Sequence, residues 1–249
     1  MNGYPLLETR GLTVRFGGLT AVDAVDAAFA PGELVGIIGP NGAGKTTFFN
    51  ALSGVVVPTA GELFVSGRRL TGHPPHHFAR HGIARTFQTP RVFGELDVAA
   101  NVDFGLRFAG RGRGSPPLLR DVDAILGLTG LRELAAQRAA AITPSQQRLL
   151  EIGMALATRP RLLLLDEVAA GLVEQEVETI ARLVRRLRDE LELTVIWIEH
   201  AVATLLQHVE RVIVLHQGRK IADGSPSEVV RNTEVIDAYL GDELAEATC

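Results

Sequence analysis

A glycine-rich segment at residues 39–46 constrains the fold of this chain more than any other feature of the sequence. It reads Gly-Pro-Asn-Gly-Ala-Gly-Lys-Thr and matches the pattern G-x-x-x-x-G-K-S/T. Residues 34–38 directly before it are apolar on both faces, as in a buried parallel strand, and residues 46–52 after it are typical of a helix. Strand, loop and helix form the context in which this pattern binds phosphate. A glycine-rich turn that matches by chance is the alternative, and the flanking strand and helix argue against it.

The residue types of the loop predict its ligand. Backbone N–H groups of such a loop wrap the phosphates of a nucleotide, because glycine lets the chain approach them closely. In this pattern the amine of Lys45 reaches the β and γ phosphates and the hydroxyl of Thr46 ligates Mg²⁺. We therefore expect ATP and Mg²⁺ as cofactors. The expected nucleotide-binding residues are Gly39, Pro40, Asn41, Gly42, Ala43, Gly44, Lys45, Thr46 and Thr47.

The second half of the chain alternates strand-like and helix-like segments. Apolar runs at 161–165, 194–198 and 211–215 predict strands, with helices between them. This alternation predicts the α/β class. The helix after the first run carries an apolar stripe at three- and four-residue steps, formed by Val177, Ile180, Val184, Leu187 and Leu191.

Other segments have weaker patterns. The chain from about 75 to 155 is predicted to be largely helical, with an exposed loop at 110–117. At the C-terminal end, a hairpin is expected near Gln217-Gly218 and a helix over 226–240.

Two adjacent carboxylates, Asp166 and Glu167, follow the four leucines at 162–165. Strand ends of this kind are where α/β folds place ligands. We expect Asp166 to hold Mg²⁺ through water and Glu167 to polarise the attacking water. The alternative is an ordinary strand end before an acidic helix start, which the helix dipole favours. The phosphate loop upstream favours the catalytic interpretation.

Three single residues are further candidates. His200 follows the strand at 194–198, at the same edge as the acidic pair, which favours a γ-phosphate contact over a structural role. The amide of Gln88 could bind the metal or water, although by itself it would be unremarkable. Phe16 lies ahead of the loop, where a ring could stack on adenine, although such a residue is more often part of a core.

A cluster of four histidines resembles a metal site in its spacing. Neither a cysteine nor an acidic residue lies within it, so a surface turn is the favoured interpretation. Its members are His73, His76, His77 and His81.

Composition excludes several classes of protein. Of 249 residues, 46% are hydrophobic and 22% charged, which excludes a disordered or fibrous chain. The net charge of −4 gives no basic footprint, so nucleic acid is not an expected partner. The single cysteine, Cys249, forms no intrachain disulfide and fits the cytosol. We expect neither a signal peptide nor a transmembrane segment, so any work at a membrane would be done by docking.

The chain resembles the ATP-binding-cassette ATPase family over nearly its whole length. The motifs that carry the resemblance follow in the family's order: the loop at 39–47, Gln88, the segment 162–167 and His200. Within that family the chain is most similar to the ATPase subunits of branched-chain amino-acid importers. The stretches that carry this likeness are 15–22, 82–88, 166–172, 198–200 and 235–241.

The resemblance implies one nucleotide-binding domain, residues 1–249, with a P-loop NTPase fold. Such a domain has a RecA-like core, an antiparallel β subdomain and a helical subdomain, here at roughly 88–157. The resemblance also implies a transport-coupled ATPase. The implied site residues are Glu167, His200, Gln88 and Lys45 for catalysis, Thr46, Gln88 and Asp166 for Mg²⁺, and Phe16 for the adenine.

Partners are implied in the same way. Members of the family dimerise head to tail around two ATP molecules, and a signature loop from the other subunit completes each site. Closure drives two transmembrane permease subunits at the cytoplasmic face of the plasma membrane, and a substrate-binding protein is an indirect partner. The segment 89–93 is implied to lie near the permease helix that transmits this motion, and a plain exposed loop is the alternative.

The signature loop departs from the family pattern. Leu-Ser-Gly-Gly-Gln of the wider family aligns with residues 142–146, Ile-Thr-Pro-Ser-Gln. Thr143 keeps a hydroxyl that could reach a γ-phosphate, but Ser145 replaces a glycine and Pro144 lacks an N–H. Val168 replaces a proline, and Val173 replaces a polar residue that links the dimer.

The losses within 142–147 concern the nucleotide held by the partner subunit, which Thr143, Ser145 and Gln146 would contact. Residues 39–47, 88, 166, 167 and 200 would serve this subunit's own nucleotide. We therefore expect a heterodimer with a competent site on this chain's own phosphate loop and a weak opposite site.

Two other functions remain open. The first is a regulatory or structural subunit that binds ATP but hydrolyses it weakly, which Ser145 and Val173 favour and Glu167 and His200 disfavour. The second is a soluble cassette protein acting on ribosomes or DNA, which the single cassette and the charge disfavour. The sequence leaves the solute open, with branched-chain amino acids as the family default and amides, urea or lipid-linked cargo as variants.

Overall fold

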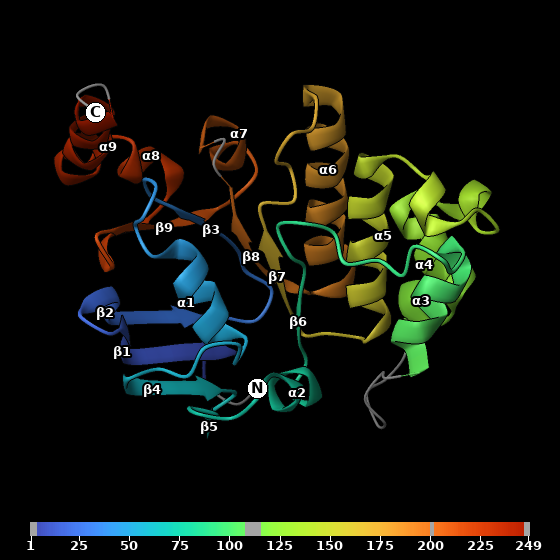
Figure 1. Ribbon diagram of the computed structural model, residues 1–249, viewed down its shortest axis with the longest axis horizontal. Coiled ribbons are helices and arrows are strands. Elements are labelled where there is room, and N and C mark those ends of the chain that lie inside the picture. The colour runs from blue at the N-terminus through green and yellow to red at the C-terminus, as the bar shows by residue number, and fades with distance from the viewer. Residues whose placement is uncertain (1–3, 108–115, 200–201, 247–249) are drawn as a thin grey trace. The chain divides into compact units, whose positions relative to one another are not determined.

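The computed structural model describes residues 4–107, 116–199 and 202–246 and divides into two compact units (Figure 1). Unit 1 combines Met1–Phe78 with Ile196–Cys249, and unit 2 is Ala79–Val195. Strand β8 (Thr194–Ile198), which was predicted as a strand and is fully buried, crosses the boundary along the chain.

Unit 1 contains an antiparallel sheet of four strands. Their order is β2-β1-β4-β5, with β1 at Leu7–Phe16, β2 at Leu19–Phe29, β4 at Ala60–Val65 and β5 at Arg68–Arg69. Gly17, with φ of 58°, makes the turn between β1 and β2. Helix α1 (Lys45–Leu52) packs against β1 and β2.

The phosphate loop of unit 1 leaves a fully buried strand, β3 (Leu34–Ile38). This strand pairs in parallel with β9 (Arg211–His216), and β9 pairs antiparallel with β10 (Arg219–Gly224). The β9–β10 hairpin turns at Gln217 and Gly218, both with positive φ, as the sequence predicts. The parallel pair places the C-terminal ends of β3 and β9 side by side, so the loop emerges next to this hairpin.

The C-terminal segment of unit 1 corrects one prediction. The single helix expected over 226–240 is two helices, α8 (Pro226–Val229) and α9 (Thr233–Glu246). Asn232 lies between them, and its side-chain oxygen accepts the backbone N–H groups of Glu234 and Val235. Its side chain therefore caps a new helix. A further short helix of unit 1, α7, spans Val202–Leu206.

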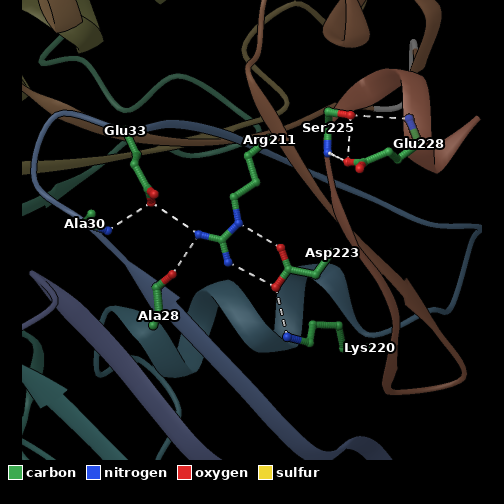
Figure 2. A network of polar contacts seen from close by, with 8 residues as sticks. All are labelled: Ala28, Ala30, Glu33, Arg211, Lys220, Asp223, Ser225 and Glu228. Carbon is green, nitrogen blue, oxygen red and sulfur yellow. Dashed lines mark hydrogen bonds and ion pairs between the residues drawn. The ribbon is translucent and has the colours of Figure 1, made fainter.

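An ion-pair network around Arg211 joins strand ends in unit 1 (Figure 2). The Arg211 guanidinium binds Asp223 through two nitrogens, at 2.7 and 3.0 Å, and also pairs with Glu33 at 3.3 Å. Its Nη1 donates to the carbonyl of Ala28 in β2. The network links β9, β10, the turn before β3 and the antiparallel sheet.

Unit 2 contains three packed helices, with α5 (Pro144–Ala157) against α3 (Val98–Arg107) and α4 (Val122–Thr129). A Cβ at Gly105 would meet the Met154 carbonyl, so glycine allows α3 and α5 to approach closely. Short 3₁₀ turns flank these helices at Pro117–Leu119, Arg132–Leu134 and Ala139–Ala141. Most of the loop predicted at 110–117 lies outside the described residues.

Unit 2 also contains the predicted strand β7 (Leu162–Asp166), buried throughout. It pairs in parallel with β6 (Ile83–Arg85), so the expectation of largely helical structure over 75–155 is wrong at this strand. Helix α6 (Glu174–Leu191) buries Val177, Ile180, Val184 and Leu187 as predicted, whereas its last residue, Leu191, is half-buried. Along the chain, the division between the units falls within helix α2 (Pro75–Arg80).

Candidate functional site

The glycines of the loop at residues 39–46 are required by its backbone. Gly39 and Gly44 have φ values of 152° and 96°, and a Cβ on either would collide with a backbone carbonyl, of Leu215 and Ala21 respectively. Gly44 also precedes the first residue of α1, with no acidic residue in the first turn of that helix. The positive end of the α1 dipole and a glycine-shaped cradle therefore coincide, as anion binding requires.

The side chain of Lys45 lies within this loop. It is 5% exposed, and its Nζ donates to the carbonyls of Gly39 and Pro40 at 2.5 and 2.9 Å. This arrangement holds the ammonium group inside the curve of the loop. The hydroxyl-bearing Thr46 is exposed and Thr47 is half-buried.

The β9–β10 hairpin supports the loop through Gly218. Its N–H donates to the Ala43 carbonyl at 3.1 Å, and its own carbonyl accepts from Asp23 at 2.8 Å. The loop is therefore hydrogen-bonded to a residue far away in the sequence.

Phe16 ends strand β1 and is 52% exposed. This exposure means that Phe16 is not a core residue, which was the alternative at that position. A half-exposed ring can stack on a planar ligand.

In unit 2, the acidic pair lies at the end of β7, as the sequence predicts. Asp166 and Glu167 are 3% and 4% exposed, and Glu167 has a positive φ of 51°. A positive φ is uncommon for glutamate and is found at functional sites.

The structure brings Gln88 and Glu167 together. The Gln88 amide donates through Nε2 to Glu167 Oε2 at 2.6 Å. A carboxylate accepts only, so the amide nitrogen must face it, and the amide oxygen remains for another ligand.

Sequence reasoning missed Arg85, which forms a buried ion pair with Asp166 at 2.6 Å. Burial raises the pKa of Asp166, and the hydrogen bond and charge of Arg85 oppose that rise. The signal in the sequence was an arginine among Ile83, Ala84 and Phe87, three positions before Gln88, because a buried arginine is costly without a partner.

Sequence reasoning also missed Arg148 and Glu151, both on α5. They are 8% and 5% exposed and bind the backbone around Gln88. Two ionisable residues on one helix, three positions apart in a run of leucines, were the signal.

The predicted signature segment forms the start of α5. Thr143 is its N-cap in a capping box with Gln146, and the Thr143 hydroxyl accepts from the Gln146 N–H at 3.2 Å. Pro144 is the first helical residue, where the missing N–H would have no partner in the helix anyway. Ser145 therefore lies within a helical turn. Thr143 and Pro144 are exposed.

The remaining candidates are His200 and the histidine cluster. His200 lies outside the described residues. His73 and His77 stack with ring centroids 4.7 Å apart. Among the described residues there is no cluster of three metal-ligating side chains, and in that same part of the chain no helix is long and apolar enough to span a bilayer.

Two known protein families match parts of this chain. The profile described as ABC transporter matches residues 22–170, and that of the branched-chain amino acid ATP-binding cassette transporter matches residues 219–245. The chain is 39% identical to "High-affinity branched-chain amino acid transport ATP-binding protein BraF" of Pseudomonas aeruginosa, over 96% of this chain and 98% of BraF.

Solved structures agree. The ADP conformation of MJ1267, an ATP-binding cassette of an ABC transporter, has a TM-score of 0.84 and 28% identity over 95% of this chain and 98% of that one. A dimeric post-hydrolysis state of the ATP-binding cassette MJ0796, bound to ADP and Pi, has a TM-score of 0.76 and 25% identity over 88% and 98% of the chains. The predicted α/β fold of the P-loop NTPase type is confirmed.

Proposed function

The chain belongs to the ATP-binding-cassette transporter family, and from that premise we propose that it is the ATP-hydrolysing subunit of an importer for branched-chain amino acids or related small polar solutes. Membership makes the chain a nucleotide-binding ATPase. The choice of solute rests on BraF, because BraF matches this chain over nearly the full length of both.

The observation that carries the hydrolytic role is the contact of Gln88 with Glu167. A general base must be held in a fixed direction, and the amide of Gln88 holds the Glu167 carboxylate at 2.6 Å. We assign to Glu167 the polarisation of the attacking water and to Gln88 the orientation of Glu167.

Family membership assigns the phosphate loop, like Glu167 and Gln88, to the binding and hydrolysis of ATP. The ammonium group of Lys45 would leave the carbonyls of Gly39 and Pro40 to bind the β and γ phosphates. Phe16 would stack on the adenine, and its 52% exposure supports that role. His200 would contact the γ-phosphate.

Mg²⁺ is the metal proposed for this chain, as a companion of ATP. The exposed hydroxyl of Thr46, the amide oxygen of Gln88 and the carboxylate of Asp166 are the hard oxygen ligands that Mg²⁺ prefers. When bound, Mg²⁺ would neutralise charge on the phosphates. Arg85 keeps the Asp166 carboxylate in one orientation for this task.

An exposed apolar patch in unit 2 supports docking to a permease subunit. Phe93, Leu96 and Phe104 are 44%, 40% and 42% exposed, and the rings of Phe93 and Phe104 meet edge to face, 4.8 Å apart. Exposed aromatic clusters commonly mark protein interfaces. We place the protein at the cytoplasmic face of the membrane, where its segment 89–93 meets the permease.

The second ATPase subunit is proposed to be a different chain. Ser145 departs from the family pattern at a position that serves the partner's nucleotide, and Val173 departs from it at a position that links the dimer, so two copies of this chain would form two weak sites. The competing function, a subunit that binds ATP and barely hydrolyses it, rests on the same two residues.

Membrane co-purification and transport test the function. The tagged chain should co-purify with permease subunits, and uptake of labelled leucine, isoleucine or valine should require ATP and be abolished by Lys45→Ala. The assignment would be overturned if the tagged chain is recovered without permease subunits, or if Lys45→Ala leaves uptake unaffected.

ATPase rates separate the heterodimer from a homodimer. The chain alone should hydrolyse ATP slowly, and the complex with its partner subunit should hydrolyse it fast. Ser145→Gly should raise the hydrolysis rate of the chain alone. Fast hydrolysis by the chain alone, unchanged by Ser145→Gly, contradicts the asymmetric arrangement.

A further inference from the structure

Two side chains of helix α5 hydrogen-bond the backbone of Phe87, the residue before Gln88. They bind both its N–H and its carbonyl. The Phe87 N–H donates to Glu151 Oε1 at 3.3 Å, and the Phe87 carbonyl accepts from Arg148 Nη1 at 2.8 Å. Both side chains are at least nine-tenths buried. The main chain at Phe87 is thereby fixed to one face of α5.

The same carboxylate also binds the other side of the glutamine. Glu151 Oε1 accepts the N–H of Arg91 at 3.0 Å. One carboxylate oxygen therefore bridges the N–H groups of Phe87 and Arg91, and Gln88 lies in the loop between these two residues. The second oxygen, Oε2, has no hydrogen-bond partner among the residues that the structure describes.

The Phe87 ring is held as well. The guanidinium carbon of Arg91 lies 4.3 Å from the ring centroid and that of Arg85 lies 5.2 Å from it. Arg85 in turn pairs with Asp166. The residue next to Gln88 thus has its N–H, its carbonyl and its ring in defined contacts, all within unit 2.

Helix α5 begins at the signature segment, with Thr143 as N-cap, and continues without a break to Ala157. Because a helix moves as a rigid rod over a few residues, a displacement of its first turn displaces Arg148 and Glu151 too. These two side chains would carry that displacement to the loop that holds Gln88.

We propose that Arg148 and Glu151 are positioning residues for Gln88, through which helix α5 couples the signature segment to the glutamine that orients Glu167. The coupling rests on the proposed function for its catalytic meaning, whereas the hold on the loop is a property of the structure alone. Simple stabilisation of unit 2 is the competing explanation.

Hydrogen exchange and NMR on the full-length chain without nucleotide test the hold directly. In Glu151→Leu, the amides of Phe87 and Arg91 should exchange at least about tenfold faster, since their acceptor is gone. The side-chain amide signal of Gln88 should move toward that of a mobile glutamine. Glu151→Gln keeps an acceptor oxygen at Oε1 and should restore both signals.

Ile152→Val is the matched control, because Ile152 lies next to Glu151 and is fully buried. It should leave the amides of residues 86–92 unchanged. If Glu151→Leu does not fold, Arg148→Met removes the bond to the Phe87 carbonyl while keeping Glu151 and should mobilise Gln88 in the same way.

The proposal is overturned if Phe87 and Arg91 exchange no faster in the leucine or methionine variant than in the control. It is equally overturned if α3, α4 and α5 all exchange faster to the same degree, because that result indicates general destabilisation. In the ATPase complex, Glu151→Leu should lower kcat and leave KM for ATP unchanged, with rescue by Glu151→Gln. Failure of the wild-type complex to hydrolyse ATP would contradict the proposed function and leave the exchange result standing.

Discussion

The side-chain amide of Gln88 donates to the Glu167 carboxylate at 2.6 Å, although the two residues are 79 positions apart in the sequence. Gln88 is exposed and Glu167 is buried, so the bond connects a surface loop to the end of a core strand. A loop that moves Gln88 therefore also changes the orientation of Glu167.

Gln88→Ala should lower the ATP hydrolysis rate far more than it weakens ATP binding. Loss of the amide frees the Glu167 carboxylate, and we expect kcat to fall about 10² fold, as for loss of a well-placed polar group. Steady-state kinetics and equilibrium binding of a fluorescent nucleotide measure the two effects. A rise in Kd equal to the fall in kcat/KM would assign Gln88 to binding instead.

Arg85→Ala should destabilise the protein by about 3–5 kcal/mol, because it leaves Asp166 buried without its cation. Urea denaturation measures this change. The control is the pair Arg85→Met with Asp166→Asn, which removes both charges and should cost clearly less than Arg85→Met alone. Equal losses for the single and double variants would mean that the ion pair contributes no coupling.

The stability of the protein should fall as pH rises through the range set by Glu151. Burial raises the pKa of Glu151 to about 7 from its ordinary 4.5, against the lowering effect of the N–H groups of Arg91 and Phe87 and of the Arg148 charge. Between these values the folded chain binds more protons than the unfolded chain, so the free energy of unfolding decreases with pH.

Glu151→Gln removes this titration. Between pH 4.5 and pH 8, the free energy of unfolding of the wild-type chain should fall by up to about 3 kcal/mol relative to that of the variant. This value follows from a pKa difference of about 2.5 between the folded and unfolded chains, at about 1.4 kcal/mol for each pKa unit. Asp166 titrates in both proteins and cancels in the difference. Parallel stability curves for the two proteins would contradict the raised pKa.

Phe16→Ala should weaken ATP binding roughly 5- to 100-fold, the range expected for one lost base-stacking contact of about 1–3 kcal/mol. Stability should hardly change, because the ring is 52% exposed. Phe16→Tyr keeps an aromatic face and should bind as the wild type does. Undiminished affinity in the alanine variant would leave Phe16 without a ligand role.

The sequence predicted those parts of the fold that have a strong local pattern. Strands β3, β7 and β8 are continuous apolar runs buried on both faces, and a run of this kind has few alternatives. Strand β6 was missed because three residues show no periodicity. The division of the C-terminal helix was missed because it depends on the side chain of Asn232.

The candidate site was predictable where a motif is contiguous. The phosphate loop and the pair Asp166-Glu167 each lie within one short segment, and both have the expected strand contexts. Arg85 and Glu151 were missed because their partners are 81 and 64 positions away. Such pairings depend on how β6, β7 and α5 pack, which no local pattern specifies.

Trapping of ATP by Glu167→Gln tests whether Glu167 drives ATP hydrolysis. The complete transporter complex carrying this variant should bind ATP with Mg²⁺ as the wild type does and retain it unhydrolysed, whereas Glu174→Gln, an exposed carboxylate near the start of α6, should hydrolyse normally. The measurement is the ratio of ATP to ADP on protein recovered after a single loading. Predominantly ATP on the Glu167→Gln complex and ADP on the control agree with the account, and ADP at the wild-type rate on both would contradict it.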